Sequence, residues 1–211
     1  MGDGFIRRLI QDHSEVEDAV WQSDSIIEIK RKNHAPFNAA IIKEKLVEAK
    51  HIQPFLNSPA SIIVNFPKIG KWDGDAILRC ERHGKAWGQW GVLMRAINSE
   101  SPERTENPEI YYSYRAIRQH TRVESVSFIL DHLLLVNHEN GKQLKVALLY
   151  QYDLCGDDVR RAWDDLGEFD VLLKTNPNGS ILEDADEVAN ALGIKAFSLK
   201  GLFAYLAKGK F

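Results

Sequence analysis

The fold of this chain is indicated most clearly by residues 169–206, FDVLLKTNPNGSILEDADEVANALGIKAFSLKGLFAYL. A short apolar run at 171–173 is followed by turn-forming residues at 176–179, which predicts a strand and a tight turn. Apolar residues then recur at helical spacing from Ile181 up to Gly193, and glycine commonly follows the end of a helix. A short strand and a last helix complete the stretch, so the sequence predicts an α/β fold.

The same order of elements recurs at residues 61–97, which indicates an internal repeat. When the chain is slid along itself, 8–42 align with 115–149 without a gap. The identical pairs include Arg8/Arg115, Ile10/Ile117, His13/His120, Val16/Val123, Glu17/Glu124, Asp24/Asp131 and Ala40/Ala147. A slightly larger shift pairs Gly70/Gly179, Asp75/Asp184, Ala76/Ala185 and Gly84/Gly193. Because order, spacing and element type agree, we predict a tandem duplication.

The predicted domains are a first repeat at 1–97, a linker at 98–112 and a second repeat at 113–211. The linker, NSESPERTENPEIYY, combines Ser, Pro and Glu without periodicity. In the first repeat we expect helices at 5–20, 47–56, 73–82 and 89–97, and strands at 25–30, 38–43, 62–65 and 85–87. Strand–helix–strand connections are almost always right-handed crossovers, so each repeat should be a mixed sheet flanked by helices.

Composition places the chain among ordinary globular proteins, with 44% hydrophobic residues, 27% charged residues and a net charge of -3. No apolar run approaches the roughly 18 residues of a membrane span, and the N-terminus lacks the apolar region of a signal peptide. Cys80 and Cys155 occupy different places in the two repeats, which argues against a disulfide or zinc framework. We therefore expect a cytoplasmic protein without a membrane partner.

Two segments resemble the restriction-endonuclease-like, PD-(D/E)xK superfamily, particularly its Mrr-type branch. Residues 171–206 are similar to that branch's last strand, alanine-bearing helix, short strand and closing helix. Residues 130–153, LDHLLLVNHENGKQLKVALLYQYD, are similar to its acid, apolar strand, turn and strand. The resemblance places Asp131 at the metal-binding acid, and the repeat places Asp24 there in the first copy. Glu17, like Glu124, is expected on the first helix, where some members carry an extra acid.

The resemblance implies a nuclease that depends on Mg²⁺ or Mn²⁺, with carboxylates from adjacent strands and a lysine around the ion. The family's (D/E)xK acid and lysine are missing, because 39–42 and 146–149 are apolar in both copies. A substitute site in the first copy would use Asp24, Glu28 and Lys30 as catalytic residues, on one face of a predicted strand. Its metal ligands would be Asp24, Glu28 and Glu17. The alternative is an edge strand with a charged outer face.

The second copy has Leu135 and Asn137 in place of the glutamate and lysine, so we expect it to be inactive. In the first copy, Lys30, Arg31 and Lys32 form a predicted basic hairpin tip that would bind phosphates of nucleic acid, unless it is only a solvated turn. His13 and His120, at equivalent places, are expected to have packing roles.

Residues 83–91, HGKAWGQWG, form an aromatic–glycine cluster together with Trp72. These tryptophans are a candidate stacking surface for a base, or alternatively they pack at an interface between the two copies. The turn at 174–179 precedes a helix and is either an anion site or a plain turn. Three hypotheses follow: a divergent nuclease with its site in the first repeat, a non-catalytic protein that binds nucleic acid or a protein partner, and a small-ligand-binding protein using the tryptophans.

Overall fold

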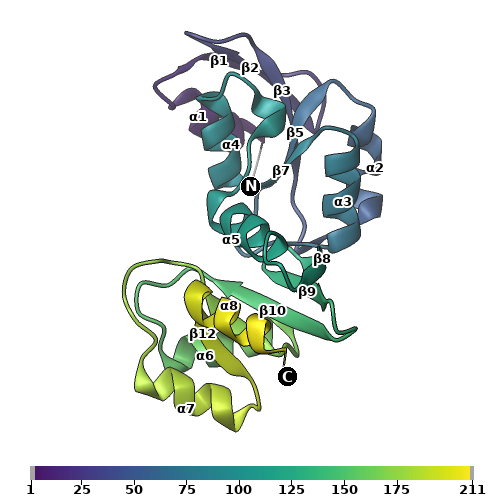
Figure 1. Cartoon of the computed structure of the whole chain (residues 1–211). Coiled ribbons are helices and arrows are strands. Elements are labelled where there is room, and N and C mark those ends of the chain that lie inside the picture. The colour runs from purple at the N-terminus through teal and green to yellow at the C-terminus, as the bar shows by residue number, and fades with distance from the viewer. Residues whose placement is uncertain (1–2, 210–211) are drawn as a thin grey trace. The chain divides into compact units, whose positions relative to one another are not determined.

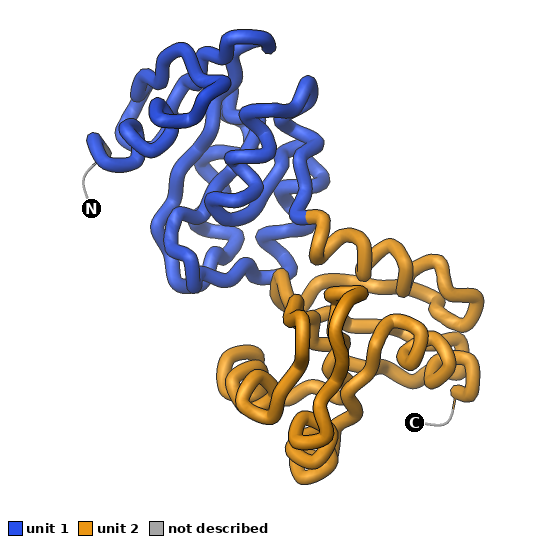
Figure 2. Tube along the Cα trace, turned by 90° about the vertical axis from the view of Figure 1, so that its left-hand side faces the viewer, with its two compact units in different colours: residues 1–107 blue, residues 108–211 orange. Residues whose placement is uncertain are grey.

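The computed structural model describes residues 3–209 of the chain (Figure 1). The chain divides into two compact units, and the boundary lies between Asn107 and Pro108 (Figure 2). We call the part before this boundary unit 1 and the part after it unit 2.

Unit 1 is a five-stranded sheet with helices on both faces. Its elements are α1 (Asp3–Gln11), β1 (Val16–Trp21), β2 (Ile26–Arg31), β3 (Phe37–Ile42), β4 (Leu46–Val47), α2 (Ala49–Leu56), β5 (Ala60–Asn65), β6 (Lys71–Trp72), α3 (Gly74–Arg82), β7 (Ala86–Gln89), α4 (Trp90–Ile97) and the 3-10 helix η1 (Pro102–Arg104). The sheet order is β1-β2-β3-β5-β7. The first three strands are antiparallel, whereas β3, β5 and β7 run parallel.

Strand alternation in unit 1 sends apolar side chains to both faces of the sheet. On one face, Ile27 and Ile29 of β2 belong to a buried cluster with Ile6 of α1 and Leu93 of α4. Helices α2 and α3 cover the other face over β5 and β7 (Figure 1). The mixed sheet flanked by helices, predicted from the sequence, is confirmed.

Unit 2 has the same architecture. Its elements are α5 (Pro108–Arg118), β8 (Val123–Leu130), β9 (Leu133–His138), β10 (Gln143–Leu149), α6 (Gly156–Leu166), β11 (Val171–Lys174), α7 (Glu183–Ala191), β12 (Lys195–Ser198) and α8 (Leu199–Lys208). Strands β8, β9 and β10 are antiparallel, and β10, β11 and β12 are parallel, in the order β12-β11-β10-β9-β8. One core lies under α5 and α8, and the other under α6 and α7.

The two units therefore share strand order, strand direction and helix placement. The correspondence extends to small features. Strands β4 and β6 pair in parallel at Val47 and Trp72, and unit 2 has an isolated parallel bridge between Leu154 and Ile181. The same two shifts that align the repeats in the sequence carry Val47 onto Leu154 and Trp72 onto Ile181.

The first helix is shorter than the predicted helix at 5–20, because α1 ends at Gln11 and β1 begins at Val16. A β-bulge at Glu17 explains the error. The register shifts between Val16 and Asp18, so the two buried core residues of β1, Val16 and Ala19, are three positions apart, and Trp21 packs against the same core. An extra residue in a strand turns its period of two into a local spacing of three, which imitates a helix. Strand β8 has the same irregularity after Val123.

The segment 98–112, which we expected to be a linker, contains secondary structure. It holds η1, which packs against β5 and β7 and buries Pro102, and the first residues of α5. The Ser- and Pro-rich composition here marks a short helical connection and a helix start at Pro108.

None of the helices within residues 3–209 is long and apolar enough to cross a membrane. Cys80 and Cys155 are both free thiols. Cys80 is buried on α3, and this burial raises its pKa to about 12.

Candidate functional site

The predicted catalytic residues are only partly brought together. Glu28 and Lys30 do share one face of β2, since Ile27 and Ile29, which alternate with them, are buried in the core. Asp24, however, lies before β2 begins, exposed in the turn between β1 and β2. Glu17 is exposed at the bulge of β1 and is not on a helix. The expectation that Asp24 shares a strand with Glu28 is therefore wrong.

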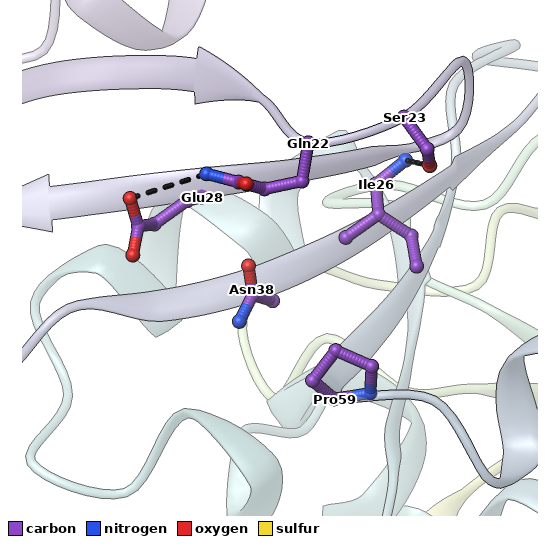
Figure 3. Close-up of a pocket in the computed structure, with 6 residues that line it drawn as sticks. All are labelled: Gln22, Ser23, Ile26, Glu28, Asn38 and Pro59. Carbon is purple, nitrogen blue, oxygen red and sulfur yellow. Dashed lines mark hydrogen bonds between the residues drawn. The ribbon is translucent and has the colours of Figure 1, made fainter.

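Glu28 lines a shallow pocket of about 310 Å³ (Figure 3). The other lining residues are Gln22, Ser23, Ile26, Asn38 and Pro59. The Gln22 side-chain amide donates a hydrogen bond to Glu28 Oε2 at 3.4 Å, and Asn38 is the register partner of Glu28 on β3. The pocket thus presents one carboxylate and two amides. Among residues 3–209, no group of three or more histidine, cysteine, aspartate or glutamate side chains is placed to hold a metal ion.

Arg31 does not belong to an exposed basic tip, contrary to expectation. Only 6% of the residue is exposed, and its guanidinium lies 4.9 Å from the centre of the Phe37 ring. It donates hydrogen bonds to the backbone oxygens of Ala35, Ala96, Ile97 and Ser99. Three of these oxygens lie at the end of α4, where the helix dipole favours a positive charge. Arg31 is therefore a structural cap.

Lys30 and Lys32 of the expected tip stay at the surface. Lys32 Nζ donates to the backbone oxygen of Ser14 at 2.6 Å.

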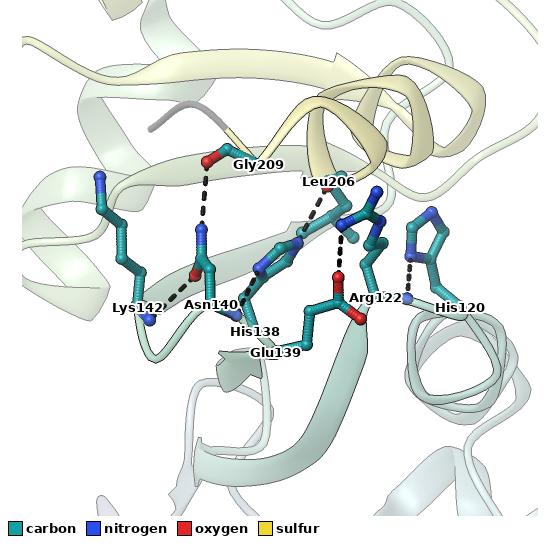
Figure 4. Close-up of polar contacts among 8 residues, drawn as sticks. All are labelled: His120, Arg122, His138, Glu139, Asn140, Lys142, Leu206 and Gly209. Atoms are coloured by element: carbon teal, nitrogen blue, oxygen red, sulfur yellow. Dashed lines mark hydrogen bonds and ion pairs between the residues drawn. The ribbon is translucent and has the colours of Figure 1, made fainter.

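His138 occupies the place in unit 2 that Arg31 has in unit 1 in the gap-free alignment of the repeats. Figure 4 shows the hydrogen bonds of its imidazole ring. Its Nδ1 accepts a hydrogen bond from Asn140 N at 3.2 Å. Its Nε2 consequently carries the proton and donates to the oxygen of Leu206, at the end of α8, at 3.0 Å. Arg31 in unit 1 and His138 in unit 2 thus occupy the same position, and each hydrogen-bonds to the end of a helix, α4 or α8.

His13 and His120 also have equivalent structural roles, as expected. His13 Nδ1 accepts from Glu15 N at 3.2 Å, and His120 Nδ1 accepts from Arg122 N at 3.3 Å. Both bonds hold the chain between the first helix and the first strand of a unit. In unit 2 an ion pair between Arg122 and Glu139 lies beside this turn (Figure 4).

Asp131, the counterpart of Asp24, is buried in the turn between β8 and β9. Its Oδ2 lies 3.3 Å from His132 Nδ1. Burial alone lowers the pKa of His132, but the hydrogen bond that His132 donates to Asp131 and the negative charge of Asp131 outweigh this effect, so the pKa lies above its ordinary value. The two acids that the sequence pairs therefore occupy equivalent turns in different environments.

A larger cavity lies where the parallel strands of unit 1 end. Strands β3, β5 and β7 bring Lys43, Phe66 and Gln89 to their carboxyl ends, an edge that commonly forms ligand sites in α/β sheets. The cavity has a volume of about 740 Å³. Its lining residues are Phe5, Leu9, Lys43, Phe66, Pro67, Lys68, Gln89, Trp90 and Gly91.

Three aromatic rings line this cavity in a connected row. The Phe5 and Phe66 rings are 6.5 Å apart at an angle of 89°, and the Phe66 and Trp90 rings are 5.5 Å apart at 83°. Lys43 and Lys68 add two exposed cationic side chains. The cavity therefore combines an apolar aromatic wall with positive charge. We call it the aromatic–lysine pocket.

Of the three tryptophans in the predicted cluster, only Trp90 lines this pocket. Trp72 and Trp87 are buried, and their rings contact each other at 5.4 Å. Sequence reasoning did not identify Phe5, Phe66, Lys43 or Lys68 as site residues. They come from three different parts of the chain, and no local pattern links them.

The turn that contains Asp24 reaches the same edge of the sheet. Ile41 N donates a hydrogen bond to the backbone oxygen of Ser25 at 2.8 Å, which places this turn beside the end of β3. Lys43 follows directly after that strand.

Comparisons with family models, curated proteins and solved structures found no match to this chain. The function of the pocket is therefore inferred from its own lining.

Proposed function

We propose that this chain is a nucleic-acid-binding protein built from two restriction-endonuclease-like units, and that it binds through the aromatic–lysine pocket of unit 1. The observation that carries the proposal is the combination in one cavity of the Phe5, Phe66 and Trp90 rings with Lys43 and Lys68.

Such a lining suits a nucleotide because each part of the nucleotide meets a matching group. Bases stack on aromatic side chains regardless of sequence, and each stacked base contributes about 1–3 kcal/mol. Phosphates bind lysine ammonium groups through a salt-dependent attraction. The volume of about 740 Å³ is large enough for a nucleoside.

The order of elements supports the fold part of the proposal. Each unit has a helix, three antiparallel strands, a helix and further parallel strands with helices between them. Each also has an aspartate, Asp24 or Asp131, in the turn before its second strand. These are the features on which the resemblance to the restriction-endonuclease-like superfamily rests. The identical topology of the units also supports an origin by duplication.

Binding without cleavage fits this geometry better than catalysis. Carboxylates that converge from adjacent strands are needed around a divalent ion. The Glu28 pocket has a single carboxylate, and Asp24 and Lys30 do not line it. The residues present therefore do not fit a Mg²⁺ or Mn²⁺ site.

The binding proposal is tested by salt titrations with a fluorescent single-stranded oligonucleotide. We expect the double variant Lys43→Ala/Lys68→Ala to bind about tenfold more weakly, with a salt slope reduced by about 1–2, because two phosphate contacts are lost. The matched control, Lys30→Ala/Lys32→Ala, removes the same charge from the hairpin tip and should bind like the wild type. A larger loss in the control would place the site at the tip. No binding by the wild type at low salt would refute the proposal.

Stacking is tested in the same assay with Phe5→Ala. We expect binding about fivefold weaker with an unchanged salt slope, because a stacking surface is lost and no charge is removed. Phe5 is 44% exposed, so its truncation should not unfold unit 1. The control Ile69→Ala shortens a more exposed apolar side chain outside the pocket and should bind like the wild type.

A separate measurement concerns cleavage. We expect no cut products when the wild type is incubated with single- and double-stranded DNA and RNA in the presence of Mn²⁺. Cleavage that disappears in both Asp24→Asn and Glu28→Gln would instead establish the divergent nuclease.

A further inference from the structure

Unit 2 has a cavity at the place that corresponds to the aromatic–lysine pocket. It lies at the carboxyl ends of β11 and β12, beside the start of α8, and has a volume of about 510 Å³. Tyr112 lines it at the place that corresponds to Phe5, whereas Thr175 and Ser198 replace Phe66 and Gln89. The lining includes Lys174, Thr175, Ser180, Ser198 and Lys200.

Lys174 is the central group of this cavity. Only 4% of the residue is exposed. Its Nζ donates to the oxygen of Asn176 at 2.7 Å and to the oxygen of Asn178, which uses two of its three N–H groups. Within the described chain no carboxylate forms an ion pair with it. The third N–H group of Lys174 makes no hydrogen bond within residues 3–209, so an anion in the cavity would supply an acceptor for it.

Burial lowers the pKa of Lys174 from its ordinary value, and the charge of Asp153 opposes this effect. The Asp153 carboxylate itself accepts hydrogen bonds from Ser180 N at 2.8 Å and Ser180 Oγ at 3.1 Å.

Two further groups converge on the same space. Ser198, the register partner of Lys174 at the end of β12, is the N-cap of α8 and accepts from Gly201 N at 3.3 Å. Lys200 is exposed in the first turn of α8 and lines the cavity. The first N–H groups of a helix lack partners within the helix, and its dipole favours a negative charge there.

The equivalent site in unit 1 shows that the fold does not require a lysine here. Asn65 takes the place of Lys174, since Asn65 pairs with Gln89 as Lys174 pairs with Ser198. The Asn65 side chain is satisfied by Glu44, accepting from its N at 2.9 Å and donating to its oxygen at 2.8 Å. A neutral residue thus closes the strand end in unit 1. Unit 1 therefore has no lysine at the position of Lys174, and its own two lysines, Lys43 and Lys68, lie at other positions of the corresponding cavity.

We propose that the cavity formed by Lys174, Ser198, Lys200 and the start of α8 is a phosphate-binding site for a diphosphate or a phosphate ester. The volume exceeds that of a single phosphate ion, which favours a ligand with a second phosphate or an organic group. The proposal is independent of the nucleic-acid site in unit 1.

The test is calorimetric titration of the full chain with sodium pyrophosphate at constant ionic strength. We expect saturable binding that weakens at least fivefold in Lys200→Ala. Lys195→Ala is the matched control, because it removes the same charge from the opposite end of β12 and should bind like the wild type. Lys174→Gln keeps a donor for the Asn176 and Asn178 oxygens and should abolish binding, with circular dichroism confirming that it folds.

A second arm separates the sources of the phosphate. We compare pyrophosphate with an oligonucleotide that carries either a 5′-phosphate or a 5′-hydroxyl group. If the 5′-phosphorylated form binds more tightly than pyrophosphate and the 5′-hydroxyl form does not, the ligand is the end of a nucleic acid. Equal or tighter binding of pyrophosphate identifies a small phosphorylated ligand. No saturable binding of pyrophosphate by the wild type, or equal losses in Lys195→Ala and Lys200→Ala, would overturn the proposal. Either result leaves the unit 1 site to be decided by its own variants.

Discussion

Replacing Arg31 with methionine will lower the free energy of unfolding of unit 1 by about 3–4 kcal/mol, because buried backbone acceptors lose a charged donor. The guanidinium bonds to the oxygens of Ala96, Ile97 and Ser99, and also to that of Ala35. Methionine has a similar length but donates nothing. The end of α4 would then keep buried carbonyl groups without partners.

Urea denaturation followed by tryptophan fluorescence measures this change well. Four of the five tryptophans, Trp21, Trp72, Trp87 and Trp90, belong to unit 1, so the emission reports mainly on that unit. Lys30→Met is the control, since the neighbouring lysine is exposed; its effect should stay within about 0.5 kcal/mol. If Arg31→Met unfolds at the wild-type urea concentration, Arg31 is not the cap that ties α4 to β2.

Replacing Gly179 with alanine will destabilise unit 2 by about 3 kcal/mol or more, through backbone strain together with a steric clash. Gly179 has a φ of 74°, and a Cβ there would lie 1.9 Å from the oxygen of Tyr152. The contacting atom belongs to the backbone, so it has no rotamer by which to move away. The turn would have to shift, and it holds the Asn178 oxygen that accepts from Lys174.

Gly141→Ala separates the two causes. Gly141 has a similar φ of 81°, but a Cβ there would meet nothing within 4 Å. This variant should therefore cost only about 1–2 kcal/mol of backbone strain. Hydrogen exchange followed by mass spectrometry resolves unit 2 from unit 1 and measures both variants. Equal effects of the two substitutions would show that the close approach of Gly179 to Tyr152 has no energetic consequence.

Secondary structure was predictable wherever the signal is local. The helical spacing that ends at Gly193 and the turn before it are confirmed, with α7 and β12 close to their expected places. The prediction failed at 5–20 because the bulge at Glu17 is set by pairing with β2, which the sequence does not display. A spacing of three between core residues is therefore found both in a helix and in a strand that contains a bulge.

The candidate sites were less predictable because their residues are far apart in the sequence and are brought together only by the pairing of strands in the sheet. Lys43, Phe66 and Trp90 follow three different strands and have no common motif, yet parallel strands bring their carboxyl ends to one edge. The reverse error occurred at Arg31. It looked like part of a charged tip, but its position on β2 points it toward the end of α4, far along the chain at Ala96.

The α/β class, the repeated order of elements and the approximate places of the later helices and strands follow from the sequence alone, because these depend on periodicity over a few residues. Which charged groups are buried and which line a cavity depends on the packing of the folded chain. Lys174 and Lys30 are both lysines on strands, and only the packing around the end of β11 leaves one of them 4% exposed beside a cavity. Burial depends on contacts between distant segments, so the surroundings of a charged side chain do not follow from its place in the sequence.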